Sequence, residues 1–186
     1  MATATTATSS TSDWKSVIRK DRRYVKFESL FNDQWKPALD SASIADEVRA
    51  LHDSRKIAHL LNVKENMLDE LVNVCLQDAA NRGRLCRIKL DISNITVKVE
   101  SHLDSLTSYL TTRYTDTLDD AGIRTIAARK QAMESLGVFP EVNQWLAALN
   151  SASEDCNIVL NDIDQAAFTL QKVLKAVEIS SAREKV

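Results

Sequence analysis

The clearest pattern in the chain is a row of aliphatic residues spaced alternately four and three positions apart. Between about residues 84 and 118 this row consists of Ile88, Ile92, Ile95, Val99, Leu103, Leu106 and Leu110. Side chains with this spacing lie on one face of an α-helix, because the helix turns once every 3.6 residues. The apolar positions do not alternate with polar ones, as they would in a half-buried strand. The pattern therefore predicts one amphipathic helix about 50 Å long.

A second row of the same kind predicts another long helix over about residues 153–179. Its members are Val159, Ile163, Ala166, Leu170, Val173 and Val177. We expect the two long helices to pack as an antiparallel hairpin or bundle. Phe168 and Ile179 lie on nearly the opposite side of the second helix, which predicts that this side is also buried, either inside a bundle or against another subunit. These two residues are the predicted oligomer interface.

The few helix breakers predict where the remaining helices begin and end. Pro37 is expected to end a helix that starts near Trp14, and Ser43 is expected to cap the next one. Gly83 is expected to break or kink the chain between a helix over about residues 64–80 and the long helix. Further predicted boundaries are a turn at residues 119–122, the end of helix 123–136 at Gly137, and a new helix whose first turn contains Pro140.

Composition agrees with an all-α fold. The chain of 186 residues has only 3 Gly, 2 Pro and 5% aromatic residues, which leaves few positions for tight turns. We therefore predict an all-α protein made of long amphipathic helices. The predicted parts are a disordered tail (1–12), an N-terminal helical region (13–82), a long helical hairpin or bundle (83–180) and a flexible C-terminus (181–186).

Charge and cysteine content narrow the class of protein further. A net charge of −2 gives no overall case for a nucleic acid or a membrane partner. No run approaches the roughly 20 apolar residues that a membrane-spanning helix needs. The three cysteines are odd in number and widely spaced, so they predict neither a disulfide framework nor a zinc site. We expect a cytoplasmic protein, in the host cytoplasm if the protein is viral.

No catalytic motif is present in the sequence. It contains no nucleophile elbow, phosphate-binding loop, dinucleotide fingerprint or zinc-ligand spacing. His52 and His59 share a helical face, but no further ligand completes a metal site around them. We therefore expect a protein that is not an enzyme and that has no cofactor, metal or catalytic residues.

Basic clusters are the strongest functional signal. The first consists of Lys15, Arg19, Lys20, Arg22, Arg23 and Lys26, interleaved with Trp14, Tyr24 and Phe27. Cations neutralise phosphates and aromatic rings stack on unpaired bases, so this mixture suits single-stranded nucleic acid. It also suits a solvated helix whose aromatic residues pack inward, and less well an anionic membrane surface. A second cluster places Arg84, Arg87 and Lys98 on one flank of the long helix.

Another feature is the segment 55–71, RKIAHLLNVKENMLDEL. Its apolar residues have the spacing of a helix-turn-helix motif, with Asn62 at the turn. The second helix of such a motif enters the major groove of DNA. Here that helix carries Asp69 and Glu70, whose negative charges are unfavourable beside DNA phosphates.

The C-terminal half, residues 84–180, resembles phage recombination mediators of the UvsY type. The similarity lies in the segments HLDSLTSYLTTRY, IRTIAARKQ and DIDQAAFTLQKVLKAVE. Members of this family are small helical proteins that assemble into rings, bind single-stranded DNA and help to load a recombinase. The resemblance implies that Arg113, Arg124, Arg129 and Lys130 lie on the DNA-binding side. The region before residue 84 has no counterpart in the family.

Three functions follow as expectations. The first is an oligomeric, non-enzymatic accessory protein of recombination or repair that binds single-stranded DNA and possesses a recombinase or other protein partner. Its predicted binding residues are Trp14, Arg19, Lys20, Arg22, Arg23, Arg84, Arg87, Lys98 and the four residues that the resemblance adds. The second is a structural or adaptor protein of a virion or scaffold, and the third is a helix-turn-helix DNA binder with a coiled oligomerisation stem.

Overall fold

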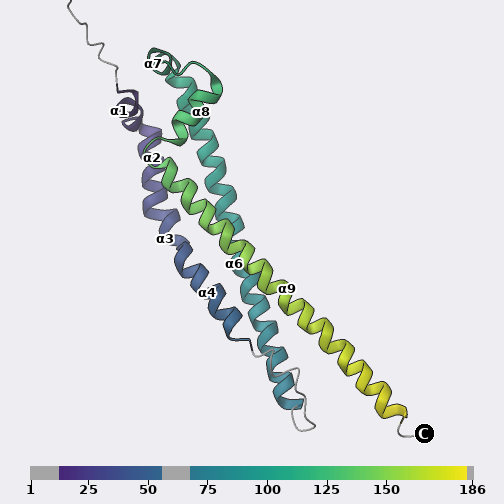
Figure 1. Ribbon diagram of the computed structural model, residues 1–186. Helices are drawn as coiled ribbons and strands as arrows, with labels where there is room; N and C mark the ends of the chain where they lie inside the picture. The colour runs from purple at the N-terminus through teal and green to yellow at the C-terminus, as the bar shows by residue number, and fades with distance from the viewer. Residues whose placement is uncertain (1–12, 56–67, 184–186) are drawn as a thin grey trace, which may run out of the picture. The chain divides into compact units, whose positions relative to one another are not determined.

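The computed structural model describes residues 13–55 and 68–183, and every regular element in these two ranges is helical (Figure 1). The elements are α1 (Trp14–Arg19), α2 (Arg22–Leu30), the π-helix η1 (Phe31–Trp35), α3 (Lys36–Ala38), α4 (Ser41–Asp53), α6 (Leu68–Arg113), α7 (Thr115–Asp120), α8 (Ile126–Glu134) and α9 (Phe139–Arg183). The predicted all-α fold is confirmed. No helix in the described ranges is long and apolar enough to cross a membrane.

The chain forms two compact units, and each is made from two separate stretches of sequence. Within the described ranges, the first unit contains residues 13–38 together with Ile95–Leu146, and the second contains residues 39–55, 68–94 and 147–183. Helices α6 and α9 each contribute residues to both units.

The first unit has an aromatic core. The Tyr24 and Phe27 rings of α2 each lie 6.0 Å from the Phe139 ring at the start of α9. Phe31 meets Trp145 edge-on at 5.6 Å. The aliphatic residues of this core come from α6, α7 and the segment around α8: Val99, Leu106, Leu110, Leu118, Met133 and Leu136. The few aromatic residues of the chain are thus concentrated here.

Gly137 marks the sharp turn before α9. Its φ of +51° lies in the left-handed region, which glycine adopts without steric cost. A Cβ at this position would overlap the hydroxyl of Tyr24, which accepts a hydrogen bond of 2.8 Å from the backbone N–H of Val138. The glycine lets α2 approach the start of α9, and Pro140 lies in the first turn of α9 as predicted.

Pro37 does not end the helix as predicted. It lies inside α3, which follows directly on the π-helix η1. Proline cannot donate a backbone hydrogen bond, and its ring clashes with the carbonyl four residues earlier. In η1 the backbone N–H of Lys36 instead bonds to the carbonyl of Phe31, five residues earlier. We infer that this wider turn accommodates the proline.

The predicted cap at Ser43 was also wrong. Helix α4 starts at Ser41, and Asp40 caps it by accepting a hydrogen bond of 3.1 Å from the backbone N–H of Ser43. Ser43 lies three residues after Asp40, which is a usual spacing between an N-cap residue and the backbone N–H that donates to its side chain. The hydrogen bonds to Ser43 hold the pKa of the Asp40 carboxyl below its usual value.

Two predicted interruptions are absent. Helix α6 passes through Gly83 without a break, and α9 joins the predicted short helix at Pro140 to the long C-terminal one. At its other end α6 stops at Arg113, five residues before the predicted end at Leu118, which lies in α7. A single glycine costs a helix only about 1 kcal/mol relative to alanine, so packing on either side of it can outweigh the loss.

In the second unit α6 and α9 run antiparallel. Arg82 of α6 pairs with Asp164 of α9 at 3.1 Å, and Lys89 of α6 donates to Asn157 of α9 at 2.5 Å. Residue numbers therefore increase along α6 in the direction in which they decrease along α9. Arg84 connects α6 to α4 through a two-pronged ion pair with Glu47. The core between these helices contains Ile44, Val48, Leu85, Ile88, Ile92, Leu149, Cys156, Val159 and Ile163.

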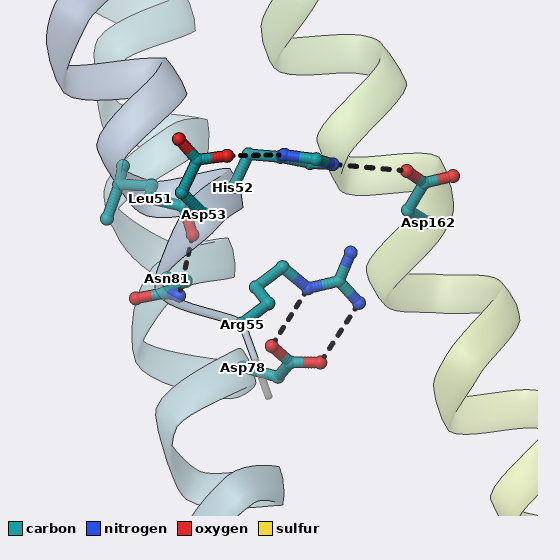
Figure 2. Close-up of polar contacts among 7 residues, drawn as sticks. All are labelled: Leu51, His52, Asp53, Arg55, Asp78, Asn81 and Asp162. Carbon is teal, nitrogen blue, oxygen red and sulfur yellow. Dashed lines mark hydrogen bonds and ion pairs between the residues drawn. The ribbon is translucent and has the colours of Figure 1, made fainter. Parts of the chain in front are cut away.

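A polar network fastens the end of α4 to α6 (Figure 2). The guanidinium of Arg55 donates to both carboxylate oxygens of Asp78, at 3.0 and 3.1 Å, and its side chain is only 2% exposed. Asn81 donates to the carbonyl of Leu51 at 3.3 Å. His52 links its neighbour Asp53 to Asp162 of α9, at 3.2 and 4.0 Å (Figure 2). These contacts join α6 to the end of α4, and those of His52 reach α9.

The apolar rows of the two long helices differ in burial. In α6 the predicted row is confirmed, because Ile88, Ile92, Val99, Leu106 and Leu110 are buried. In α9 only Val159 and Ile163 are buried, and the row becomes exposed by Val173. The side chain of Val177 lies outside the described residues. The α9 row borders an open groove of about 330 Å³, lined mainly by Val74, Ala79, Ala166, Ala167, Leu170 and Leu174.

Candidate nucleic-acid interface

The predicted N-terminal basic cluster forms α1 and the first turns of α2 in the first unit. Its six cations are all exposed, whereas Tyr24 and Phe27 are buried in the core. Burial follows from helical spacing, because Ile18, Tyr24, Phe27 and Phe31 face inward. Trp14 is half-buried, with the ammonium of Lys15 lying 5.6 Å from its ring. Of the three interleaved aromatic residues, only Trp14 has a ring that a ligand could reach.

A buried carboxylate lies at the centre of this cluster. Asp21 is the N-cap of α2, and it accepts a hydrogen bond of 2.7 Å from the backbone N–H of Arg23. It also accepts hydrogen bonds from the hydroxyls of Tyr114, at 2.9 Å, and Tyr109, at 3.3 Å. Burial by itself raises the pKa of Asp21, but the hydrogen bonds, that from Tyr114 first, outweigh it and the pKa is lowered.

Two arginines lie against the tyrosines that bind Asp21. The guanidinium of Arg23 is 4.0 Å from the centre of the Tyr109 ring, a distance typical of a cation–π contact. Arg113 lies 5.8 Å from both the Tyr109 and Tyr114 rings, and its Nε is 3.5 Å from Asp21. The pKa of Arg113 is raised, mainly through its hydrogen bond with Tyr114. Both arginines are therefore held in defined positions while remaining exposed to solvent.

We call this surface the basic corner, and define it as Lys20, Arg22, Arg23, Lys26 and Arg113. It contains five exposed cations, two of which, Arg23 and Arg113, contact the buried Asp21 or the tyrosines that donate to it. Arg22 and Lys26 are four positions apart, and so lie on one face of α2. The sequence predicted four of these five cations in one cluster but assigned Arg113 to a different one. The sequence analysis did not assign Asp21, Tyr109 or Tyr114 to this site. The only feature that could have pointed to them is the position of Asp21 directly before a helix, where it can act as the N-cap.

The resemblance grouped Arg113 with Arg124, Arg129 and Lys130, and the structure does not place Arg129 on an open surface. Its guanidinium pairs with Asp119 at 2.6 Å and donates to the carbonyl of Ile123 at 3.2 Å. Only 16% of its side chain is exposed, so Arg129 closes the turn between α7 and α8. Arg124 and Lys130 are exposed.

Lys130 lies at a groove of the first unit that has a polar threonine wall. The wall is formed by α6 and α7, through Thr107, Ser108, Thr111, Thr112 and Thr115. The hydroxyls of Thr111, Thr112 and Thr115 donate to backbone carbonyls three or four residues earlier. Hydroxyls used in this way have no proton left to donate to a phosphate. The groove is therefore a weaker candidate for an anion than the basic corner.

The remaining predicted binding residues are divided between the units. Arg84 is tied to Glu47, at 2.5 and 3.0 Å, and this pair raises the pKa of Arg84. Arg87 is exposed in the second unit, and Lys98 is exposed in the first. The predicted oligomer residues Phe168 and Ile179 are 58% and 49% exposed. Most of the predicted helix-turn-helix segment, residues 56–67, lies outside the described residues, as does the predicted tail 1–12.

Fold and site together define an all-α protein with a basic corner in its first unit. Comparison with protein-family models, with curated proteins and with solved structures gave no match. The resemblance to recombination mediators thus stays a prediction from the sequence. Within the described residues no cluster of His, Cys, Asp or Glu has the arrangement of a metal site.

Proposed function

We propose that the protein is a non-enzymatic accessory factor that binds the phosphate backbone of single-stranded nucleic acid through the basic corner. The observation that carries the proposal is a group of five exposed cations in the first unit, of which Arg113 lies 3.5 Å from the buried Asp21 and Arg23 stacks on a tyrosine that donates to it. Neutralising phosphates releases the counterions condensed on the nucleic acid, which is the main source of affinity for such a surface. The acidic overall charge does not oppose this, because the cations are concentrated locally.

Pre-organisation of the arginines supports binding. Arg23 is stacked on Tyr109, and Arg113 is held between two tyrosine rings and Asp21. A free arginine side chain loses rotational freedom when it binds phosphate, whereas one already held in place loses less. Arginine also presents several N–H groups in a fixed plane, so that some can stay on Asp21 while others reach a phosphate.

The aromatic residues support a preference for backbone over base contacts. Tyr24 and Phe27 are buried, and Arg23 lies over one face of the Tyr109 ring. Trp14 remains as a ring on which one base can stack, a contact worth about 1–3 kcal/mol. We therefore expect binding with little dependence on base sequence.

The direct test is fluorescence anisotropy of a labelled oligothymidine, titrated with the whole protein at several salt concentrations. The test variant is R22Q/K26Q, which removes two charges of the basic corner without touching the Asp21 network. If both cations contact phosphate, the slope of log affinity against log salt should fall by about 0.7 for each contact. Affinity at low salt should fall as well.

Two matched variants make the result specific. K172Q/K175Q removes two exposed charges from α9 in the second unit, and it should bind like the unchanged protein. R124Q/K130Q tests the side that the resemblance implies. A loss confined to that variant would move the site away from the basic corner. No binding by the unchanged protein at low salt would reject the proposal and favour the structural or adaptor hypothesis.

A further inference from the structure

A second apolar row runs along the part of α6 that belongs to the second unit. It consists of Val72, Leu76, Ala79, Gly83, Cys86 and Leu90, again at alternating steps of four and three. Unlike the core row, every member is exposed. Val72, Leu76 and Leu90 are 50%, 64% and 59% exposed. We call this set the outer row.

The outer row lies on the side of α6 opposite its buried positions, with Ala79 at the edge of the groove between α6 and α9. At 100° per residue, its mean direction is about 150° from that of the buried positions between Leu71 and Ile92. Contacts with α4 are made by Asn81 and Arg84, and contacts with α9 by Arg82 and Lys89. None of these four residues belongs to the outer row. Apart from Ala79, which lines that groove, the members of this stripe of about 27 Å have no partner among residues 68–183 or in α4.

Gly83, in the middle of the outer row, gives an independent indication of a partner. Glycine inside a helix costs about 1 kcal/mol relative to alanine. A Cβ built at Gly83 would meet nothing within 4 Å, and its φ is not in the left-handed region. Neither packing nor backbone conformation within the described chain therefore requires a glycine here. Small residues in a helix allow another helix to approach closely, and Ala79 and Cys86 extend the small surface on either side.

We propose that the outer row binds the outer row of a second copy of this chain, with the two α6 helices crossing antiparallel at Gly83. The order of side-chain sizes argues for a second copy. Leu76 lies seven residues before Gly83 and Leu90 seven residues after it, with smaller side chains between. A two-fold axis at Gly83 therefore places Leu76 opposite Leu90 of the second copy, and small residues opposite small ones. Such self-complementarity is what a symmetric dimer interface requires.

The charges beside the outer row are compatible with this arrangement. In the antiparallel pair, Arg87 lies opposite Ala80 of the second copy and Lys89 lies opposite Cys75. Arg82 lies near the axis, but each copy neutralises it with its own Asp164 at 3.1 Å. In a parallel pair with Gly83 against Gly83, Arg82 of one copy would instead lie near Arg87 of the other. Flanking residues that are five positions apart approach each other in this way in parallel coiled coils. Because Asp164 neutralises Arg82 in either orientation, the charges are compatible with the antiparallel pair, and cross-linking distinguishes it from the parallel one.

Sedimentation velocity of the whole protein over a range of concentrations tests the proposal, which is independent of nucleic-acid binding. We expect dimers that L76E or L90E dissociates, raising the dissociation constant by more than about tenfold because a carboxylate would be buried. Both positions are largely exposed in one copy, so helicity measured by circular dichroism should be unchanged. I158E, which changes a 60% exposed apolar residue of α9, is the matched control and should dimerise normally.

Cross-linking tests the orientation. In a C75S background, A79C should form a disulfide with Cys86 of the second copy, because the two positions lie on opposite sides of Gly83 at nearly equal distances. Q77C, which points away from the outer row, should not. Four results would overturn the proposal: a monomer at all concentrations, a dimer unaffected by L76E and L90E, dissociation by F168E alone, or efficient Cys86–Cys86 linkage, which indicates parallel helices.

Discussion

At the scale of single residues, Asp21 connects the folding of the first unit to its basic surface. The carboxylate caps α2, accepts hydrogen bonds from two tyrosines of the α6 end and lies beside Arg113. Its pKa is lower than in an unfolded chain. A carboxyl of this kind stabilises the folded state above its unfolded pKa, and that stabilisation is lost as the pH falls toward its folded pKa.

We therefore predict that D21N is less stable than the unchanged protein by about 2 kcal/mol at pH 7. The difference should shrink as the pH falls below about 4, because the unchanged Asp21 then becomes protonated as well. Urea unfolding followed by circular dichroism at pH 7 and at lower pH measures both effects. D116N, which changes an exposed aspartate of α7, is the control. A difference in stability that stays constant with pH would contradict this role of the charge.

Gly137 provides the second prediction at this scale. G137A should lower the free energy of unfolding by at least about 2 kcal/mol, because a side chain there is strained at φ +51° and meets the Tyr24 hydroxyl. G122A is the matched control, since Gly122 has a φ of +83° but open space around it. It should cost only about 1 kcal/mol. Thermal melts of the two variants compare them, and equal losses would mean that contact with Tyr24 is unimportant.

At the scale of helices, the sequence correctly predicted the buried face of α6, which a repeated pattern of side chains specifies. It was wrong about helix ends that were predicted from one residue alone. The row from Ile88 to Leu110 was predicted correctly because many side chains repeat one period. Gly83 and Pro37 were taken as breakers from their individual preferences. Tertiary packing offset the cost of Gly83, and a π-turn accommodated Pro37. Such compensation depends on neighbours that are distant in sequence, so local preference cannot predict it.

The joint between α4 and α6 leads to a prediction at the same scale. D78A should destabilise the protein by about 3–5 kcal/mol, because it leaves the buried guanidinium of Arg55 without its carboxylate (Figure 2). R55L/D78L removes both charges and should recover most of the loss, since an apolar pair avoids the cost of desolvation. Chemical unfolding of both variants gives the comparison. A double variant as unstable as D78A would show that the helices need this ion pair itself.

At the scale of the whole molecule, the three cysteines report how the second unit opens. Cys75 and Cys86 are exposed, whereas Cys156 is buried and burial raises its pKa to about 11. At pH 8 only about one Cys156 thiol in a thousand is therefore the reactive thiolate. We predict two fast-reacting thiols and one slow one with a coloured disulfide reagent. The slow reaction should accelerate in urea as the unit unfolds.

A matched variant assigns the phases. C75S/C86S should remove the fast phase and leave the slow one. A fast reaction in this variant would mean that the core around Cys156 opens readily in the folded protein. In a dimer formed through the outer row, Cys86 should also react more slowly at high protein concentration than at low concentration.

The basic corner shows what could not be predicted from the sequence at this scale. Its cations were visible as a cluster, but the contacts that organise them join Asp21 to Tyr114, 93 residues away. The sequence could not reveal that Arg113 joins this group, or that Asp119 holds Arg129. The first assignment depends on how α2 packs against the end of α6 and the second on the turn between α7 and α8, and the pattern of apolar residues specifies neither.

The long separation in sequence between α2 and the residues that cover it has a consequence for synthesis on the ribosome. The Tyr24 hydroxyl finds its partner 114 residues later, at Val138, and the aromatic core of the first unit also needs Phe139 and Trp145. At about 5–20 residues per second, α1 and α2 wait roughly 6–23 s for that partner to be made. Throughout this interval the nascent chain carries Tyr24, Phe27 and Phe31 without their native cover. The aromatic residues of α2 and η1 are thus made well before the residues that cover them, so we expect this segment to need chaperone protection during translation.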